Sequence, residues 1–423
     1  MPAEPEGKEK IFSGYQVFVI AILSILQFSI ILDFMVLSPL GAILMPELHI
    51  TTSQFGWVVS AYAFSAGASG ILAAGFADRF DRKKMMIFFY SGFLLGTLLC
   101  ALAPDYPLLL AARIVTGIFG GVIGSVSFAI ITDLFKFETR GRVMGFVQMS
   151  FAASQVLGLP IGLVLANQFD WHAPFWMIAI FGIGVWVLIL IYMKPVDGHL
   201  KLKSERNPLQ HLIKTFTLPD YIKAFFCTTL LATGGFMLMP FGSAFSTNNL
   251  GLTMAQLPWI YGITGAFSIL TGPLIGKLSD RFGKLKIFVV GTIIGALMVA
   301  IYTQLDVTPL WVVIALNIIL FTGISARMIS SSALVSAIPA PQDRGAFMSI
   351  NSSVQQVAGG VASAIAGLIV LQTSDGNLHH YDILGYVVIG TMVTTVVMMY
   401  YINKQVIRMA REAVKPEMIT KVA

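Results

Sequence analysis

The stretch Ala77-Asp-Arg-Phe-Asp-Arg-Lys-Lys84 recurs as Ser279-Asp-Arg-Phe-Gly-Lys-Leu-Lys286, and each copy lies between two long apolar segments. The two Asp-Arg pairs stand 202 residues apart (280 minus 78), nearly half of the 423-residue chain. A long repeat with a basic turn at equivalent places is typical of a duplicated membrane protein whose halves move against each other. The repeat therefore predicts transport, whatever the substrate.

The composition points to lipid as the main solvent of the chain. Apolar residues make up 56% of the sequence and charged residues only 11%, unlike an ordinary soluble globule. Twelve apolar segments are each close to or above the roughly 20 residues that cross a bilayer core. They cover residues 15–45, 54–76, 85–102, 107–134, 143–166, 173–193, 221–245, 254–275, 287–303, 309–338, 346–371 and 383–402. We expect an all-α polytopic membrane protein with twelve transmembrane helices.

The Lys and Arg residues predict how the chain is oriented. Of the 27 basic residues, all except Arg113 and Arg327 fall in the two tails and in every second loop. By the positive-inside rule these segments are cytoplasmic, and so are both termini. The net charge of +6 is then explained by topology and anionic lipid head groups, and nucleic-acid binding is not expected.

The repeat also predicts the domain organisation. A shift of 202 residues aligns Phe34 with Phe236 and Gln54-x-x-Trp57 with Gln256-x-x-Trp259. Two parallel, pseudo-symmetric six-helix bundles follow, related by an axis along the membrane normal. The predicted parts are a tail (1–14), an N-terminal bundle (15–193), a cytoplasmic linker (194–220), a C-terminal bundle (221–402) and a second tail (403–423). In the linker Leu209, Leu212, Ile213 and Phe216 have the spacing of an amphipathic helix on the inner leaflet.

These residues resemble the major facilitator superfamily, whose loop between helices two and three has the form G-x-L-x-D-R-x-G-R-R/K. The second copy, beginning at Gly276, fits this form, whereas the first has Ala74 and Asp81 where the family has glycines. The resemblance implies a cluster that locks the halves in the outward-facing state, because an acid can cap a neighbouring helix while arginines bridge carboxylates. The alternative is that the charges only set topology. The predicted gate residues are Asp78, Arg79, Arg82, Asp280 and Arg281.

Two further motifs narrow the resemblance. Arg113-x-x-x-Gly117-x-x-Gly120-Gly121 is similar to the family motif whose arginine is associated with proton coupling, and Gly158-Leu-Pro160-Ile-Gly162 is similar to the Gly-Pro motif of the antiporters. Small residues beside a proline let two helices approach and bend, so Gly158, Pro160 and Gly162 join the predicted gate. The resemblance favours the twelve-helix drug:proton antiporter and sugar-efflux-like branch, and ordinary helix packing is the other explanation for these glycines.

Three charged residues lie in the hydrocarbon region of the predicted spans, away from their ends, where an ionised side chain costs at least about 2.5 to 3.5 kcal/mol. We interpret Asp33 as the proton carrier and Arg113 as its coupling partner, because burial favours the neutral acid and a nearby cation favours the carboxylate. The alternative is a permanently ionised lock between the two. Arg327 is a candidate for binding an anionic group of the substrate, with snorkelling toward the inner face as the other interpretation.

Other residues on the helices that line the cavity in this family could contact substrate. They are Gln27, Phe34, Phe236, Asn317 and Trp259. Cys100 and Cys227 fall in apolar segments, so packing is expected and a disulfide or metal site is not. His379-His380, beside Asp375 and Asp382, is read as a solvated loop rather than a metal site. No cofactor is expected apart from the proton as coupling ion.

The main functional hypothesis is therefore a proton-driven exporter of small organic molecules or drugs, working by alternating access as a monomer in a plasma membrane, expected to be a bacterial inner membrane. A proton symporter or uniporter for a metabolite is the second hypothesis, and a transporter-like receptor without net flux is the third. An enzyme is not expected, because the sequence has no P-loop, HExxH or GxSxG motif.

Overall fold

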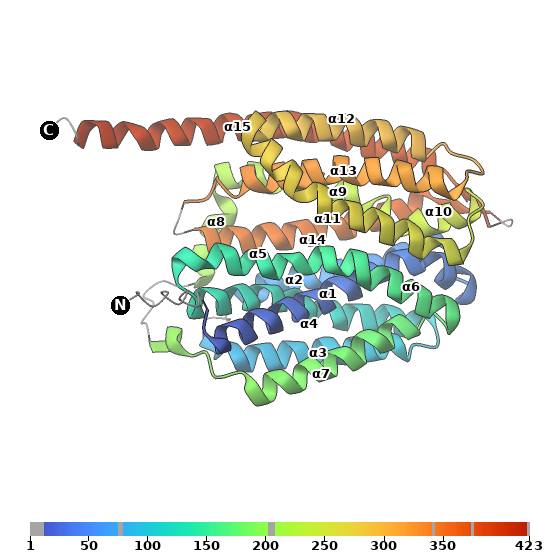
Figure 1. The fold of residues 1–423 in the computed structure, drawn as a ribbon, viewed down its shortest axis with the longest axis horizontal. Coiled ribbons are helices and arrows are strands. Elements are labelled where there is room, and N and C mark those ends of the chain that lie inside the picture. The colour runs from blue at the N-terminus through green and yellow to red at the C-terminus, as the bar shows by residue number, and fades with distance from the viewer. Residues whose placement is uncertain (1–11, 75–78, 202–207, 341–342, 374–375, 421–423) are drawn as a thin grey trace, which may run out of the picture.

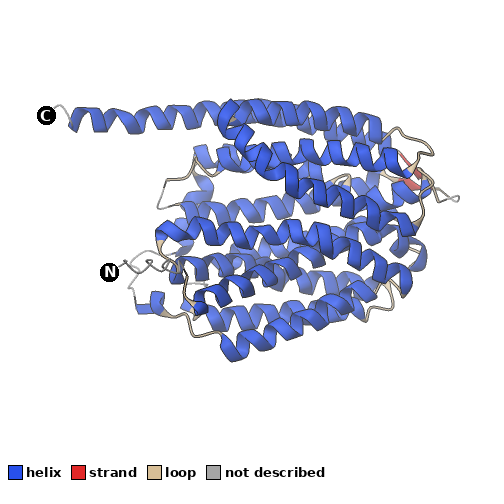
Figure 2. Cartoon of the chain, in the orientation of Figure 1, coloured by secondary structure: helices blue, strands red, loops and turns tan. Residues whose placement is uncertain are grey.

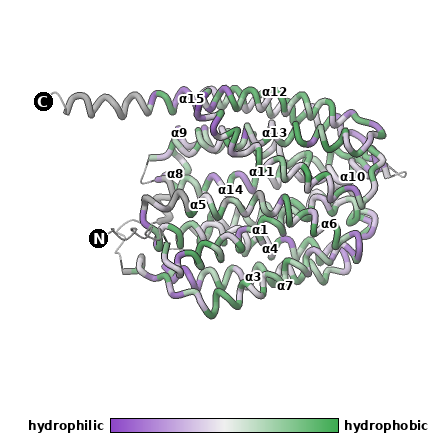
Figure 3. The backbone as a smooth tube through the Cα atoms, in the orientation of Figure 1, coloured by the Kyte–Doolittle hydropathy of each residue, from purple (hydrophilic) through white to green (hydrophobic). Residues whose placement is uncertain are grey.

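The computed structural model describes residues 12–74, 79–201, 208–340, 343–373 and 376–420. In these ranges twelve helices are long and apolar enough to cross a membrane, which confirms the predicted fold class. Figure 2 shows helices throughout, with a small pair of strands, and Figure 3 shows that the helices are apolar along most of their length. The chain is an integral, multi-pass membrane protein.

The first six spans form the N-terminal half, and the last six form the C-terminal half. The N-terminal half contains α1 (Gly14–Glu47), α2 (Thr52–Ala74), α3 (Arg82–Ala101), α4 (Tyr106–Leu134), α5 (Phe137–Ala153), η2 (Ser154–Gly158), α6 (Leu159–Gln168) and α7 (Ala173–Tyr192). Between the halves lie η3 (Gly198–Lys201) and α8 (Pro208–Thr217), the latter within the segment predicted as an amphipathic linker helix. The C-terminal half contains α9 (Pro219–Phe236), η4 (Met239–Phe241), α10 (Gly242–Asn248), η5 (Met254–Gln256), α11 (Leu257–Phe282), α12 (Lys284–Tyr302), α13 (Leu310–Val335), α14 (Arg344–Ile369), β1 (Leu371–Gln372), β2 (Leu378–His379) and α15 (Tyr381–Thr420).

Figure 1 shows the two halves side by side, with the start of α1 and the end of α15 at the same end of the bundle. We call this the terminal end, and the other the opposite end. The main contacts between the halves are α2 with α14, α11 with η2 and α6, and α1 with α10.

Several hydrogen bonds between described residues join the halves toward the opposite end, and one runs from Ser60 Oγ on α2 to the Gly360 carbonyl of α14 at 2.7 Å. Thr52 Oγ1 donates to the Val370 carbonyl at 2.6 Å. Ser243 Oγ donates to the Ser38 carbonyl at 3.2 Å, and Asn167 Nδ2 donates to the Met254 carbonyl at 2.9 Å. The opposite end is therefore closed in this structure.

Two spans are interrupted, and proline lies at each break. In the fifth span the helix widens into the π-turn η2 just before Pro160, whose missing N–H and ring cannot continue a regular α-helix. In the seventh span α9 ends at Phe236, and the chain passes through η4, which contains Pro240, before α10 begins. The interruption of the fifth span falls at Gly158-Leu-Pro160, the motif in which the sequence indicated close helix packing and bending.

The sequence repeat corresponds to repeated local structure at the opposite end. Thr51 and Gln54 exchange hydrogen bonds at the start of α2, and Thr253 and Gln256 form the same capping box before α11. The tryptophans that follow, Trp57 and Trp259, are 46% and 63% exposed. Exposed tryptophans near helix ends are typical of a membrane–water interface.

The two copies of the opening motif differ in structure where they differ in sequence. Gly283 has φ +98, a left-handed conformation that joins α11 directly to α12 and that glycine adopts without strain. Asp81, at the equivalent place, has φ −55 and caps α3 by accepting hydrogen bonds from the Lys83 and Lys84 amides. The same Asp81 carboxylate accepts from the Val196 amide at 3.3 Å, so the start of the linker is held against the N-terminal half.

Candidate functional site

The centre of the candidate site is a buried ion pair inside the N-terminal half. Arg113 Nη1 on α4 lies 2.7 Å from Asp33 Oδ2 on α1, and both side chains are fully buried. The same nitrogen also donates to the Asp33 backbone carbonyl at 3.4 Å. Removing two charges from water is costly, and their mutual attraction offsets that cost only when they stay paired. The structure brings together the two residues that the sequence nominated for proton coupling.

Two more helices complete the surroundings of the pair. Thr97 on α3 donates its hydroxyl to Asp33 Oδ1 at 3.3 Å, and the Arg113 guanidinium lies over the Tyr62 ring of α2, 4.6 Å from its centre. Among the described residues, the buried Nε and Nη2 atoms of Arg113 have no hydrogen-bond partner. Among the described residues, the guanidinium thus contacts one carboxylate and one aromatic ring, while its Nε and Nη2 make no hydrogen bond.

Glycines allow the helices to come this close. A Cβ at Gly117 or Gly121 of α4 would collide with the Tyr62 or Ala66 carbonyl of α2. In the fifth span a Cβ at Gly158 would lie 2.6 Å from the Leu32 side chain. In both glycine motifs, small residues serve close helix packing around the ion pair.

The Gly-Pro motif also contacts α1 and the other half. A Cβ at Gly162 would lie 3.0 Å from the Val36 side chain of α1, one helical turn from Asp33. Pro160 of the same motif lies 3.4 Å from a Cβ built at Gly262 of α11, in the C-terminal half. The motif therefore lies between the helix that carries Asp33 and the partner half.

Aromatic rings connect the ion pair to the boundary between the halves. Phe34 lies 5.2 Å from the Tyr62 ring, and 5.7 Å from Phe236 of the C-terminal half, measured between ring centres. Both phenylalanines are half-buried. The repeat of Phe34 in Phe236 is thus a direct contact across the boundary, two aromatic side chains away from Arg113.

Arg327, the third ionisable residue, is far from this pair in the fold. It lies on α13 in the C-terminal half, is 3% exposed, and has its guanidinium 5.6 Å from the centre of the Phe288 ring on α12. Its buried Nε and Nη2 atoms have no hydrogen-bond partner among the described residues. Arg327 is therefore a buried cation whose Nε and Nη2 atoms face no acceptor in the part of the chain that the structure describes.

The remaining substrate candidates do not form one cluster. Gln27 is half-buried and faces α4, with Oε1 3.9 Å from a Cβ built at Gly124. Asn317 is 9% exposed and donates Nδ2 to the Val313 carbonyl of its own helix at 2.9 Å. Trp259 lies on the surface at the opposite end. Of the five candidates, Phe34 and Phe236 meet at the boundary.

His379 and His380 are both exposed. In the described ranges no group of three or more His, Cys, Asp or Glu residues is placed to hold a metal ion. His380 Nδ1 lies 3.3 Å from the Ile369 carbonyl, and Asp375 falls outside the described residues.

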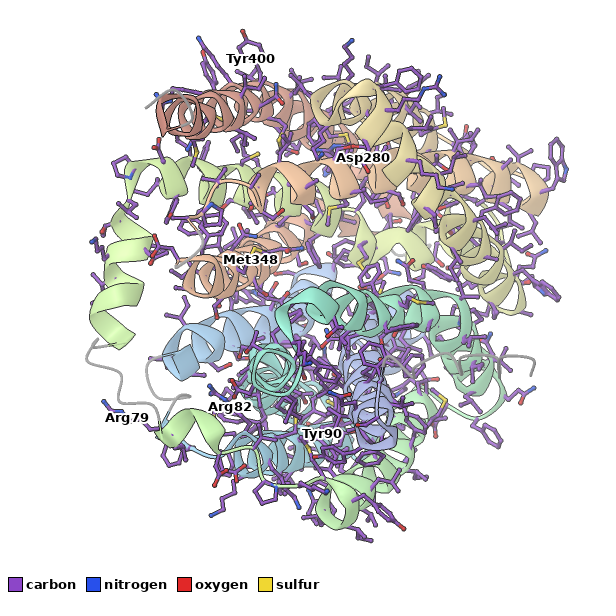
Figure 4. The ribbon with its side chains drawn as sticks, turned by 60° about the vertical axis from the view of Figure 1, so that its left-hand side comes forward. Arg79, Arg82, Tyr90, Asp280, Met348 and Tyr400 are labelled. Carbon is purple, nitrogen blue, oxygen red and sulfur yellow. The ribbon has the colours of Figure 1, made fainter. Side chains whose placement is uncertain are left out.

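The predicted gate residues have different surroundings in the two halves. Arg82 is 5% exposed, and its Nε lies 3.2 Å from Asp133 Oδ2 at the end of α4. Asp280 is exposed and bonds Lys284 of its own motif at 3.4 Å, while the Arg281 guanidinium lies 5.4 Å from the centre of the Phe282 ring. Figure 4 shows Arg79 and Arg82 on one half and Asp280 on the other. Asp78 lies outside the described residues.

Three contributors to the site were missed in the sequence. Thr97 and Tyr62 are ordinary residues for an apolar segment, and they carry no repeat, charge or motif that would mark them. Asp133 had a signal, since it is an acid at the end of a predicted span, on the side where the basic turns lie. A carboxylate at this place could have been expected to pair with an arginine of the turn, because arginine and carboxylate form strong, charge-assisted hydrogen bonds.

Comparison with known proteins places the whole chain in one family. A sequence model of the Major Facilitator Superfamily matches residues 23–223 and again 224–417. An uncharacterized MFS-type transporter, YceJ of Bacillus subtilis (strain 168), is 29% identical over 348 residues, covering 81% of this chain and 86% of that protein. Multidrug resistance protein 3 of the same organism is 31% identical over 152 residues, covering 36% of this chain and 30% of that protein.

A solved structure has a similar fold. A crystal structure of a D-xylose-proton symporter is similar with a TM-score of 0.73 and 18% identity, covering 90% of this chain and 97% of that chain.

Proposed function

The chain belongs to the major facilitator superfamily, and from that premise we propose that it is a proton-coupled exporter of small organic molecules. It is a membrane transporter and not an enzyme. Export, proton coupling and the class of cargo are the proposed parts. A relative named as a multidrug resistance protein supports export, although the match covers only about a third of each chain.

The observation that carries the proposal is the fully buried Asp33–Arg113 pair at 2.7 Å. A carboxylate in this place can exist in two forms: ionised and paired with Arg113, or protonated and neutral. The repeat does not require the acid, because the counterpart of Asp33 is Gly235. A Cβ at Gly235 would meet nothing within 4 Å, so lack of space does not explain the missing carboxylate there. Burying an ion pair costs desolvation free energy, and only one half contains this pair. A role in proton coupling explains it better than a role in holding the fold together.

The contacts between the halves support a cycle of alternating access. The hydrogen bonds at Thr52, Asn167 and Ser243 close the opposite end, and the basic loops lie at the terminal end. With the terminal end in the cytoplasm, as the positive-inside rule predicts, this arrangement is closed to the outside. We place the membrane as the plasma membrane, and specifically a bacterial inner membrane.

In the proposed cycle the proton and the cargo alternate. Asp33 takes up a proton when the opposite end opens to the more acidic outside, and the neutral acid releases Arg113 from ionic pairing. After the halves rock, the proton leaves to the cytoplasm and the pair re-forms, while cargo moves outward. Protonation changes the charge of the paired site from zero to plus one, which gives the two states different stabilities.

The test is cargo flux in proteoliposomes with an imposed pH gradient. The cargo panel would be three small aromatic compounds that carry a primary amine, a carboxylate and both groups, and an internal dye would report proton movement. Exchange predicts that protons and cargo move in opposite directions. We expect Asp33→Asn to lose accumulation driven by the gradient while keeping exchange of labelled for unlabelled cargo.

The matched control is Asp306→Asn, which changes an exposed acid in a loop at the opposite end. It should transport as the parent protein does. Movement of protons and cargo in the same direction would replace the exporter by a symporter. Full gradient-driven transport by Asp33→Asn would remove Asp33 from the mechanism, and absence of flux for all three compounds would favour a receptor role.

A further inference from the structure

We propose that Tyr62 is a positioning residue for proton exchange, whose ring holds the Arg113 guanidinium when Asp33 is protonated. This inference rests on the proposed function, because it assigns a role within the cycle of Asp33. The ring lies 4.6 Å from the guanidinium carbon, and Tyr62 is 1% exposed. No motif of the sequence marks this residue.

The need for a second partner follows from the geometry of the pair. When Asp33 is neutral, Arg113 stays charged in a fully buried site, and its Nε and Nη2 atoms already lack acceptors among the described residues. The Asp33 backbone carbonyl can still accept from Nη1, and the Tyr62 face adds a second favourable interaction, since the quadrupole of the ring attracts a cation and does so more strongly when desolvated. The ring therefore stabilises the protonated form of the site more than the ion-paired form.

The other groups around the pair do not serve this purpose. Thr97 donates to Asp33, and Cys100 on α3 lies 3.9 Å from Thr116, with its Sγ facing that hydroxyl. Among the described residues, the titratable side chains next to Asp33 and Arg113 are therefore Tyr62 and Cys100. A neutral thiol is a weak hydrogen-bonding group, so it does not replace an aromatic face.

The position of the ring depends on the arrangement of the halves. Phe34 contacts the Tyr62 ring from α1, and Phe236 of the C-terminal half contacts Phe34. On the α4 side, a Cβ at Gly120 would lie 2.8 Å from the Tyr62 hydroxyl, so this space admits no larger residue. The ring is fixed between Arg113 and an aromatic contact that crosses the boundary.

The experiment measures gradient-driven transport against external pH for a series of rings at position 62. Tyr62→Phe keeps the aromatic face and should keep the profile of the parent. Tyr62→Leu removes the face, so protonation of Asp33 becomes harder and half-maximal transport should need about a tenfold higher proton concentration, a shift of about one pH unit.

A second series covers the case in which Tyr62→Leu does not fold. Phenylalanine at position 62 is replaced by its 4-fluoro and 3,4,5-trifluoro forms, which withdraw charge from the face with little change in size. The half-maximal pH should fall stepwise with fluorination. A profile that does not move along this series overturns the inference.

The two proposals can fail separately. If Asp33→Asn loses gradient-driven transport and the fluorinated series shows no shift, the role of Tyr62 is wrong and the proton role of Asp33 stands. If Asp33→Asn keeps gradient-driven transport, the proposed coupling itself is wrong. A change in the maximal rate with an unchanged half-maximal pH would indicate that Tyr62 only supports packing.

Discussion

Replacing Gly56 by leucine should force the closed opposite end to open. A Cβ at Gly56 on α2 would lie 2.9 Å from the Ser363 carbonyl and 3.2 Å from the Gly367 Cα of α14. Both neighbours are backbone atoms, which cannot turn away as a side chain can. The two helices must separate at this point, and they belong to different halves.

The size of the effect follows from the cost of overpacking. Inserting a side chain into a well-packed contact costs about 1 to 3 kcal/mol. The cost falls on the closed arrangement alone if the helices part in the open one. The equilibrium between the two arrangements then moves by roughly 5- to 150-fold toward opening.

The assay is the reaction of a cysteine introduced at position 52 with a maleimide in detergent, where membrane orientation does not matter. Thr52 is 5% exposed and bonds the other half, so the thiol of Thr52→Cys is shielded while the opposite end is closed. The two native thiols give little background because Cys100 and Cys227 are buried. We expect labelling of the introduced thiol to accelerate about tenfold or more when Gly56→Leu is added.

The control is Gly184→Leu on α7, because a Cβ there would meet nothing within 4 Å. It should leave the labelling rate unchanged. If the protein that carries both Thr52→Cys and Gly56→Leu is folded and its introduced thiol reacts no faster than with Thr52→Cys alone, close packing of α2 on α14 does not hold this end shut.

Three further predictions concern stability and cargo affinity. Arg327→Met should raise the midpoint of thermal unfolding, because each unmade buried donor costs about 1 to 3 kcal/mol; an unchanged or lower midpoint would reveal an acceptor for Arg327. Asp133→Asn should clearly lower the midpoint of thermal unfolding, because it leaves the buried Arg82 with a weaker partner. Asp280→Asn removes an exposed ion pair worth less than about 1 kcal/mol, so it should change the midpoint little. Equal effects of the two substitutions would contradict this assignment. Trp259→Ala should change the cargo concentration for half-maximal transport by no more than about twofold, as for an exposed position away from the site, and a tenfold increase would restore Trp259 as a substrate contact.

The spans and the duplication could be read from the sequence because both depend on patterns that survive without tertiary structure. Long apolar segments must be helical in lipid, since each backbone group needs an internal partner. The capping residues Gln54 and Gln256 each lie three residues before a tryptophan, so the two copies of the repeat align without a gap at this place. The interruption of the seventh span was not foreseen, because Pro240 was counted within one continuous apolar segment.

The ion pair was only half predictable. Asp33 and Arg113 stand out in the sequence by their charge, but the ends of the apolar segments do not determine whether two side chains lie at the same depth. The contact arises because α1 is 34 residues long, continues past Pro39 to Glu47, and runs beside α4 near the opposite end. Tyr62 and Thr97 could not be found, because the face that a neutral residue presents is decided by packing between helices.

The contact between Phe34 and Phe236 has a consequence for how such a chain could have arisen. In a symmetric homodimer, a residue on the two-fold axis contacts the same residue of the partner subunit. A residue away from the axis contacts a different residue of the partner. Phe34 and Phe236 are equivalent positions of the repeat and lie 5.7 Å apart between ring centres, so they occupy the place of an axial residue. The two halves of the single chain thus pack as the two subunits of a symmetric dimer would. In a single chain the two copies can differ, so Asp33 stands in one half and Gly235 at the equivalent place in the other, whereas Phe34 and Phe236 must still fit against each other.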